Sequence, residues 1–387
     1  MARYHDLKGK GFYFILFLWF LWFMNFNVRT IFSPIMPLIE DEFMVSHAQA
    51  GGVFIFQSAG YGFSLFFSGF FCGRLGYRKS IIISLIVSSA LCFSTFFVKD
   101  FSLLYFLSLI FGISTGIYLP SAIPLITEYF SEKTWGRSIA IHDSAASISI
   151  FSAPFIALFF LQFVEWRGIF TVFGVIFALA AITFCFASDE LKIAGARRVM
   201  AGDLIRTRAL WIMAILWIFA AGANLGVYFV VPLYLTKELS LSIEYANTVF
   251  GISRLGGVVV AISVGFLVDR FSLRKIMCFI MLATGILTIL VARGPARSIG
   301  LFLFLQASFV TGFFPVGLVC ISRMFARETR GMATGLILTI GVTFGWGIIP
   351  YLLGLSGDNL SFRFGILLLG LTVMMSSGLT FLLKELK

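Results

Sequence analysis

The chain has 387 residues, of which 59% are hydrophobic and 12% are charged, and its formal net charge at pH 7 is +11. A water-soluble core of this size could not bury so much apolar surface, so the composition excludes a soluble globular protein and indicates a polytopic membrane protein. The basic residues stand in short clusters beside predicted helix ends. Membrane topology and anionic lipid headgroups explain such clusters, and we expect no nucleic-acid partner.

Apolar runs of about 20 residues, the length that crosses a bilayer as a helix, recur along the whole chain. The first run is too long for a signal-peptide core, so we expect a retained helix. In chain order the predicted transmembrane helices cover residues 11–38, 48–72, 80–98, 102–126, 138–163, 168–187, 210–234, 246–268, 275–292, 298–321, 332–355 and 363–383. The prediction is an all-α membrane protein with twelve transmembrane helices.

The loops between these helices differ in charge. One side of the membrane receives 21 Lys and Arg residues, counting both termini, and the other side receives six. Because positive charge accumulates in cytoplasmic loops, both termini are predicted to be cytoplasmic. We expect an integral protein of the plasma membrane, such as a bacterial inner membrane.

A polar interval divides six predicted helices from six. We expect an N-terminal bundle over residues 1–188, a cytoplasmic linker over 189–209 and a C-terminal bundle over 210–387. Internal repeats support this division: GFFCGRLGYRK at 69–79 recurs as GFLVDRFSLRK at 265–275, and YFSEKTWGR at 129–137 recurs as MFARETRGM at 324–332. The two pairs share offsets of 196 and 195 residues, which indicates a duplicated chain.

The first repeat resembles a loop signature of the major facilitator superfamily, Gly-x-Leu-Ala-Asp-Arg-x-Gly-Arg-Lys. The resemblance covers the whole chain, and it implies two six-helix bundles whose loops close the cytoplasmic side. The second copy keeps the signature acid at Asp269, whereas the first has Gly73 there, for which Glu128 or Glu132 could compensate. The residues assigned to gating are Gly69, Arg74, Arg78, Glu128, Arg137, Asp269, Arg270 and Arg274.

Two arginines within the predicted helices have no counterpart in the other half of the chain. The position 196 residues after Arg29 is Leu225, and the position 196 residues before Arg254 is Ser58. An arginine inside a membrane helix costs about 2.5–3.5 kcal/mol on insertion scales, so each cation needs compensation. One interpretation is a structural ion pair with an internal carboxylate, of which the predicted helices contain few. The other is a pair of guanidinium groups that bind a carboxylate or another anion bidentately.

A closer resemblance bears on this choice. The monocarboxylate and oxalate/formate porters have a carboxylate-binding arginine in helix 8, which Arg254 in GISRLGG matches. The anion:cation symporters have a cation in helix 1, which Arg29 matches, although their Asp-Arg pair reads Val28 and Arg29 here. The resemblance implies a secondary active transporter that moves a small organic anion by proton symport or anion exchange, with a binding site between the two bundles.

Other polar residues lie within the predicted helices. They could bind substrate oxygens or form interhelical hydrogen bonds, and Asn224 and Tyr228 share one helix face because they are four residues apart. The candidates are Asn27, Gln57, Asn224, Tyr228, Gln306 and Trp346. The adjacent pair His142 and Asp143 could carry a coupled proton, or it could have a structural capping role.

Alternative functions remain open at this stage. The 48 phenylalanines favour efflux of hydrophobic drugs, whereas the internal cations and the absence of an arginine near Ser108 oppose it. A receptor or scaffold of the same fold would bind a ligand without transport. Zinc, nucleophile-elbow and phosphate-loop motifs are absent, and the five cysteines lack paired spacing, so we expect neither an enzyme nor a metal or cofactor. The expected partners are an anion, protons and lipids, and the expected state is a monomer.

Overall fold

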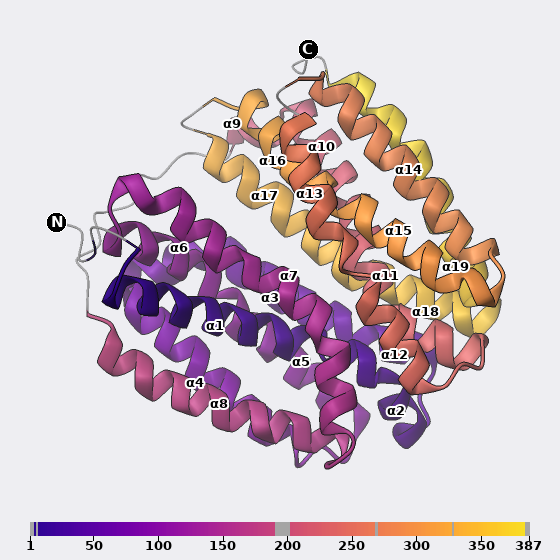
Figure 1. Cartoon of the computed structure of the whole chain (residues 1–387), viewed down its shortest axis with the longest axis horizontal. Coiled ribbons are helices and arrows are strands. Elements are labelled where there is room, and N and C mark those ends of the chain that lie inside the picture. Colours follow the sequence, from indigo (N-terminus) through magenta and orange to yellow (C-terminus); the bar gives the residue numbers. More distant parts are fainter. Residues whose placement is uncertain (1–3, 5–6, 190–201, 268–269, 327–328, 384–387) are drawn as a thin grey trace. The chain divides into compact units, whose positions relative to one another are not determined.

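A computed structural model describes residues 4, 7–189, 202–267, 270–326 and 329–383, which form a helical protein (Figure 1). In chain order the α-helices are α1 (Lys10–Thr30), α2 (Phe32–Phe43), α3 (His47–Leu75), α4 (Tyr77–Thr95), α5 (Phe101–Gly116), α6 (Tyr118–Tyr129), α7 (Trp135–Phe160), α8 (Trp166–Ala187), α9 (Gly202–Ile205), α10 (Arg208–Ala221), α11 (Val227–Leu233), α12 (Ile243–Ile252), α13 (Gly256–Leu267), α14 (Leu273–Arg293), α15 (Ile299–Thr311), α16 (Phe313–Met324), α17 (Arg330–Val342), α18 (Ile349–Asn359) and α19 (Phe362–Ser376).

Within the described ranges, eleven helical segments are long and apolar enough to cross a membrane. Several of them join two of the α-helices, as Lys10–Phe43 joins α1 and α2. The remaining predicted span, residues 246–268, corresponds to α12 and α13, each too short to cross alone. The sequence prediction of an all-α polytopic membrane protein is confirmed.

The chain forms two compact units. The first contains Met1–Phe32 and Ala59–Arg197, and the second contains Ser33–Ser58 and Arg198–Lys387. The C-terminal end of the first span and the start of the second span therefore belong to the same unit as the C-terminal helices. Residues 190–201 of the predicted linker lie outside the described residues, and the division at 189–209 stays a prediction.

Each unit is built from long helices packed in pairs. In the first unit α1 packs against α7 and α4 packs against α8, and in the second α14 packs against α19 and α10 against α17. Figure 1 shows α4 beside α8 and α14 beside α19. The buried faces hold aromatic and aliphatic side chains such as Phe177 and Ile280, while large apolar residues such as Phe186 stay exposed, as expected of helices that face lipid.

Four predicted helices are interrupted by turns where the sequence suggested continuous segments: the first at Ile31, the fourth at Ile117, the eighth at Ser253–Leu255 and the tenth at Gly312. The first span breaks at Ile31, and the proline at Pro34 lies in the first turn of α2, where its missing N–H is tolerated. The eighth span breaks at Ser253–Leu255. There the N–H groups of Arg254 and Leu255 bond three residues back, to the carbonyls of Gly251 and Ile252, so the turn tightens between α12 and α13.

The second unit also contains π-helical turns, at Gly222–Gly226, Tyr234–Glu238 and Thr343–Ile348. In the first of these the N–H of Val227 bonds five residues back, to the carbonyl of Gly222. The first and third turns pack together, because a Cβ atom at Gly226 would lie 2.5 Å from the carbonyl oxygen of Gly345. Glycine therefore permits the close approach of these two turns.

A substitution at this crossing tests the packing. We expect Gly345→Ala to lower stability by about 1–3 kcal/mol, since its methyl group would meet the backbone nitrogen of Gly222 at 2.8 Å. Gly335→Ala is the matched control, because no atom lies within 4 Å of a Cβ atom there, and removing a helical glycine stabilises by about 0.5–1 kcal/mol. Thermal unfolding of the purified proteins in detergent compares the two, and equal shifts would contradict the packing.

Candidate functional site

Arg254 lies in the turn between α12 and α13, inside the second unit. Its Nη1 donates a hydrogen bond to Oδ1 of Asn224 at 3.2 Å. The guanidinium carbon lies 4.8 Å from the ring centre of Tyr228 and 5.6 Å from that of Phe250. The structure thus brings together three residues that the sequence singled out, and both Asn224 and Tyr228 contact Arg254 from one face of the seventh span.

The hydrogen bonding of this cluster leaves donors available. Nε of Arg254 is buried and donates to no atom in the described part of the chain. Because Oδ1 of Asn224 accepts from Arg254, the amide presents its Nδ2 hydrogens as donors. No described carboxylate forms an ion pair with Arg254, so the cluster is cationic and rich in donors. Such an arrangement can bind a carboxylate through charge-assisted hydrogen bonds.

Arg29 lies in α1, in the first unit, and only 4% of it is exposed. Its Nε and Nη2 donate to the backbone oxygen and Oδ1 of Asn25, at 3.3 and 3.4 Å. The guanidinium carbon lies 4.3 Å from the ring centres of both Phe26 and Tyr61. Cation–π contacts of this kind contribute about 0.5–2 kcal/mol each. Across the described ranges Arg29 also has no carboxylate in an ion pair, and its hydrogen-bond acceptors and the rings beside it are neutral.

The other predicted polar residues have separate environments. Asn27 is buried, and its Nδ2 donates to the Phe23 carbonyl at 3.0 Å. Gln57 is buried in α3, and Trp346 lies in the π-helical turn Thr343–Ile348. The described structure contains no hydrogen bond between either arginine and Asn27 or Gln57. Gln306 bonds to other helices, to the Ala223 carbonyl at 2.7 Å and to Oγ1 of Thr288 at 3.3 Å.

His142 and Asp143 face different surroundings. His142 is fully buried, and its ring stacks with Trp22 and Tyr118 at centroid distances of 5.7 and 5.9 Å. The Tyr118 hydroxyl donates to the Leu18 carbonyl at 3.0 Å, so it accepts from Nε2 of His142 at 3.2 Å. Nδ1 of His142 then carries a buried lone pair with no hydrogen bond in the described residues. Asp143 is exposed.

Two of the residues predicted to act in gating, Arg78 and Arg274, make equivalent contacts in the two halves. Nη2 of Arg78 donates to the Cys185 carbonyl at 2.6 Å, and its Nε donates to the Ser188 carbonyl at 2.9 Å, at the C-terminus of α8. In the second unit Nη2 of Arg274 donates to the Leu383 carbonyl at 2.7 Å, just after the last helix. Each arginine therefore holds the end of the final helix of its half, as expected for a loop cation.

The other residues predicted to act in gating have fewer contacts among the described residues. Gly69 lies in α3, and the guanidinium of Arg74 lies 5.9 Å from the Phe70 ring. Glu128, Arg137 and Arg270 are exposed. Asp269 lies outside the described residues.

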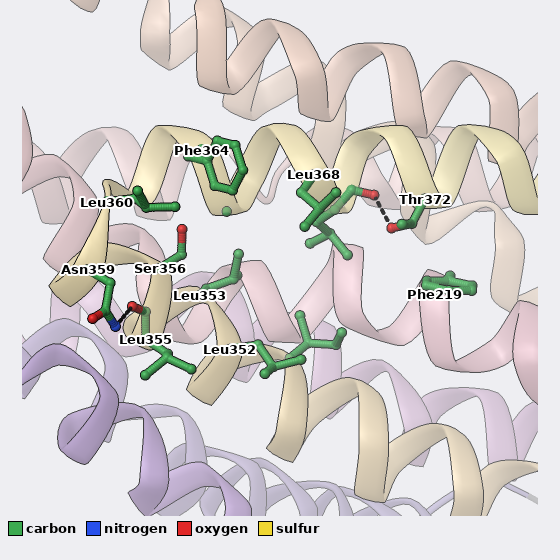
Figure 2. A pocket seen from close by; sticks show the side chains of 13 residues that line it. Phe219, Leu352, Leu353, Leu355, Ser356, Asn359, Leu360, Phe364, Leu368 and Thr372 are labelled. Atoms are coloured by element: carbon green, nitrogen blue, oxygen red, sulfur yellow. Dashed lines mark hydrogen bonds between the residues drawn. The ribbon is translucent and has the colours of Figure 1, made fainter.

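A separate cavity of about 460 Å³ lies among α10, α18 and α19 (Figure 2). Its walls are mainly leucine and phenylalanine, and its few polar groups include Asn359, whose Nδ2 donates to the Leu355 carbonyl at 2.8 Å. None of the predicted site residues lines it. It offers no charge to an anion.

Sequence reasoning missed several partners of the two arginines. Asn25 precedes Arg29 by four residues, and Phe250 precedes Arg254 by four residues. Helical spacing would have placed both beside their arginine. Tyr61 carried no such signal, because its contact with Arg29 joins two helices. Among the described residues no group of three His, Cys, Asp or Glu side chains could hold a metal ion.

Comparisons with known proteins agree with this architecture. The family model described as Major Facilitator Superfamily matches residues 18–291 and 219–386. The chain is also similar in fold to a solved bacterial homologue of the human lysosomal transporter Spinster, in an inward-facing and occupied conformation. The TM-score is 0.82 with 15% sequence identity, over 98% of this chain and 99% of that one.

Three relatives found by sequence are 22–24% identical to this chain. The cis,cis-muconate transport protein of Acinetobacter baylyi is 23% identical over 352 residues, 86% of this chain and 84% of that protein. The 4-hydroxybenzoate transporter PcaK of the same organism is 22% identical over 375 residues, with coverage of 85% and 81%. The transporter YybF of Bacillus subtilis is 24% identical over 225 residues. This match covers about half of each protein, 55% of this chain and 55% of YybF.

The capping role of Arg78 can be tested by removing its donors. We expect Arg78→Met to lower stability by about 1–3 kcal/mol, because two carbonyls at the end of α8 lose a charged donor. Arg74→Met is the control, since among the described residues its exposed side chain contacts only the ring of Phe70. Thermal unfolding in detergent measures both, and an equal loss in the two variants would argue against the cap.

Proposed function

The chain belongs to the major facilitator superfamily, and from this premise we propose that it transports a small organic anion, a carboxylate, by alternating access. Membership makes it an integral membrane transporter and not an enzyme.

One observation carries the proposal. The guanidinium of Arg254 has a neutral amide, two aromatic rings and an unused Nε donor around it, and no carboxylate pairs with it within the described chain. Burying an uncompensated cation is unfavourable in an apolar bundle, so an anionic ligand is the natural partner. Arg29 has the same chemistry in the first unit, and we assign it to anion binding as well.

The surroundings of both arginines support an acid with a flat apolar body. Tyr228 and Phe250 lie beside Arg254, while Phe26 and Tyr61 lie beside Arg29. Aromatic rings bury the apolar part of a ligand while the guanidinium binds its carboxylate. The names of the muconate and 4-hydroxybenzoate relatives point to acids of this kind. We therefore choose 4-hydroxybenzoate as the probe.

The proposal places the protein in the plasma membrane, with both termini cytoplasmic, on the asymmetry of loop charge. Transport proceeds by proton symport or by anion exchange. For symport we assign the proton to His142 and Asp143, a buried imidazole with a free lone pair next to an exposed carboxyl group.

Charge removal tests the anion site. We expect Arg254→Gln to weaken 4-hydroxybenzoate binding about 10- to 100-fold, because a charged hydrogen-bond donor contributes about 1.5–3 kcal/mol. Arg29→Gln should also weaken the binding of 4-hydroxybenzoate. The control is Arg297→Gln, which removes an exposed arginine between α14 and α15. Calorimetric titration with 4-hydroxybenzoate, and with its uncharged amide, measures the loss.

Two outcomes would contradict this assignment. The first is unchanged binding of the acid by Arg254→Gln and Arg29→Gln. The second is stabilisation of all variants by cationic dyes and not by acids, which would favour drug efflux.

The coupling assignment has its own test. In proteoliposomes we expect Asp143→Asn to abolish accumulation of 4-hydroxybenzoate driven by a pH gradient, while exchange of labelled for unlabelled acid continues, because only net flux requires the proton. Asp100→Asn, at the cap of α5, is the control. Retained gradient-driven accumulation in Asp143→Asn would remove this carboxyl group from the coupling.

A further inference from the structure

Gln306 joins three helices of the second unit. It lies in α15 and is 1% exposed. Its Nε2 donates to the Ala223 carbonyl at 2.7 Å and to Oγ1 of Thr288, in α14, at 3.3 Å. Two hydrogen bonds from one buried amide therefore tie α14 and α15 to the π-helical turn Gly222–Gly226.

The accepting carbonyl belongs to an irregular turn. In Gly222–Gly226 the hydrogen bonding shifts from four to five residues back, as in the bond from the Val227 N–H to the Gly222 carbonyl. Inside a membrane, backbone groups that such a shift disturbs require other partners, which neighbouring helices supply. Gln306 supplies one to Ala223. Its bond favours this turn over a regular α-helical turn.

The residue after Ala223 is Asn224, whose Oδ1 accepts from Arg254. Asn224 lies inside the π turn, so the backbone conformation of the turn sets the direction of the Asn224 amide relative to the guanidinium. A continuous series of contacts runs from Gln306 through the Ala223 backbone to Asn224 and Arg254.

We propose that Gln306 is a positioning residue for the anion site: it holds the π turn that presents the Asn224 amide to Arg254 and to a bound carboxylate. This inference rests on the proposed function. Gln306 itself does not contact the anion. The corresponding position of the first half, 195 residues earlier, is Phe111, which has no side-chain amide to donate such hydrogen bonds.

A double-mutant cycle on ligand binding tests the role. The variants are Gln306→Met, which keeps the length of the side chain and removes the donor, Asn224→Ala, and the two combined. We expect each single variant to raise the dissociation constant of 4-hydroxybenzoate about five- to ten-fold, the size of one lost hydrogen bond. Because Gln306 acts through Asn224, the double variant should bind within about two-fold of Asn224→Ala.

Thr288→Val is the matched control. It removes the weaker acceptor of Gln306 and keeps the 2.7 Å bond to Ala223, so the dissociation constant should change less than about two-fold. Each variant is checked for a single elution peak and cooperative unfolding without ligand. If Gln306→Met does not fold, Gln306→Asn replaces it in the cycle, since its shorter amide does not reach the Ala223 carbonyl.

The outcomes separate this inference from the proposed function. Independent effects, with the double variant weakened by the product of the single ones, would overturn the positioning role. So would unchanged binding by Gln306→Met when Arg254→Gln weakens it. Unchanged binding by Arg254→Gln would overturn the anion site itself, and the role of Gln306 with it.

Discussion

The central constraint on this molecule is a permanently charged guanidinium held inside an apolar helical bundle. An arginine does not lose its proton there, so the protein or a ligand must compensate its charge. In the described structure neutral groups surround Arg29 and Arg254: asparagine oxygens and the faces of aromatic rings. These contacts make burial tolerable without neutralising the charge. A site of this kind retains its affinity for an anion, which a structural ion pair would abolish.

Both arginines lie at irregular points of their helices. Arg29 precedes the break at Ile31 by two residues, and Arg254 lies within the break between α12 and α13. The π turn that carries Asn224 is a third irregularity. Transporters bind substrates with interrupted helices, because the interruption frees backbone groups and redirects side chains within the membrane. Glycine at the start of α13 permits close packing against α15, since a Cβ atom at Gly256 would meet Oγ of Ser308 at 2.0 Å.

The sequence predicted those parts of the structure that depend on composition and local spacing. It identified the apolar spans, the duplicated loop cations Arg78 and Arg274, and the shared face of Asn224 and Tyr228. Each of these depends on residues close together in the chain or repeated at a fixed offset. The same four-residue spacing would also have identified Asn25 and Phe250 beside the arginines.

The interruptions could not be predicted in this way. The π turn at Gly222–Gly226 depends on contacts with Gly345 and Gln306, which lie more than 80 residues from the contacting residues in sequence. A four-residue spacing within one helix cannot predict such contacts. The contact of Tyr61 with Arg29 likewise joins two helices. The break at Ser253–Leu255 lies in a glycine-rich segment, which indicates close packing without specifying a turn.

Flux tests the central claim most directly, namely that this transporter carries an anion bound by Arg254. Purified protein in liposomes loaded with unlabelled 4-hydroxybenzoate would be given the labelled acid outside, and its entry would be followed over time. We expect the native protein to take up the labelled acid rapidly in exchange for the unlabelled acid. Liposomes loaded with the uncharged amide should show no such exchange. Arg254→Gln should lose the exchange although the protein is still folded. Equal exchange by the native protein and Arg254→Gln would contradict the claim.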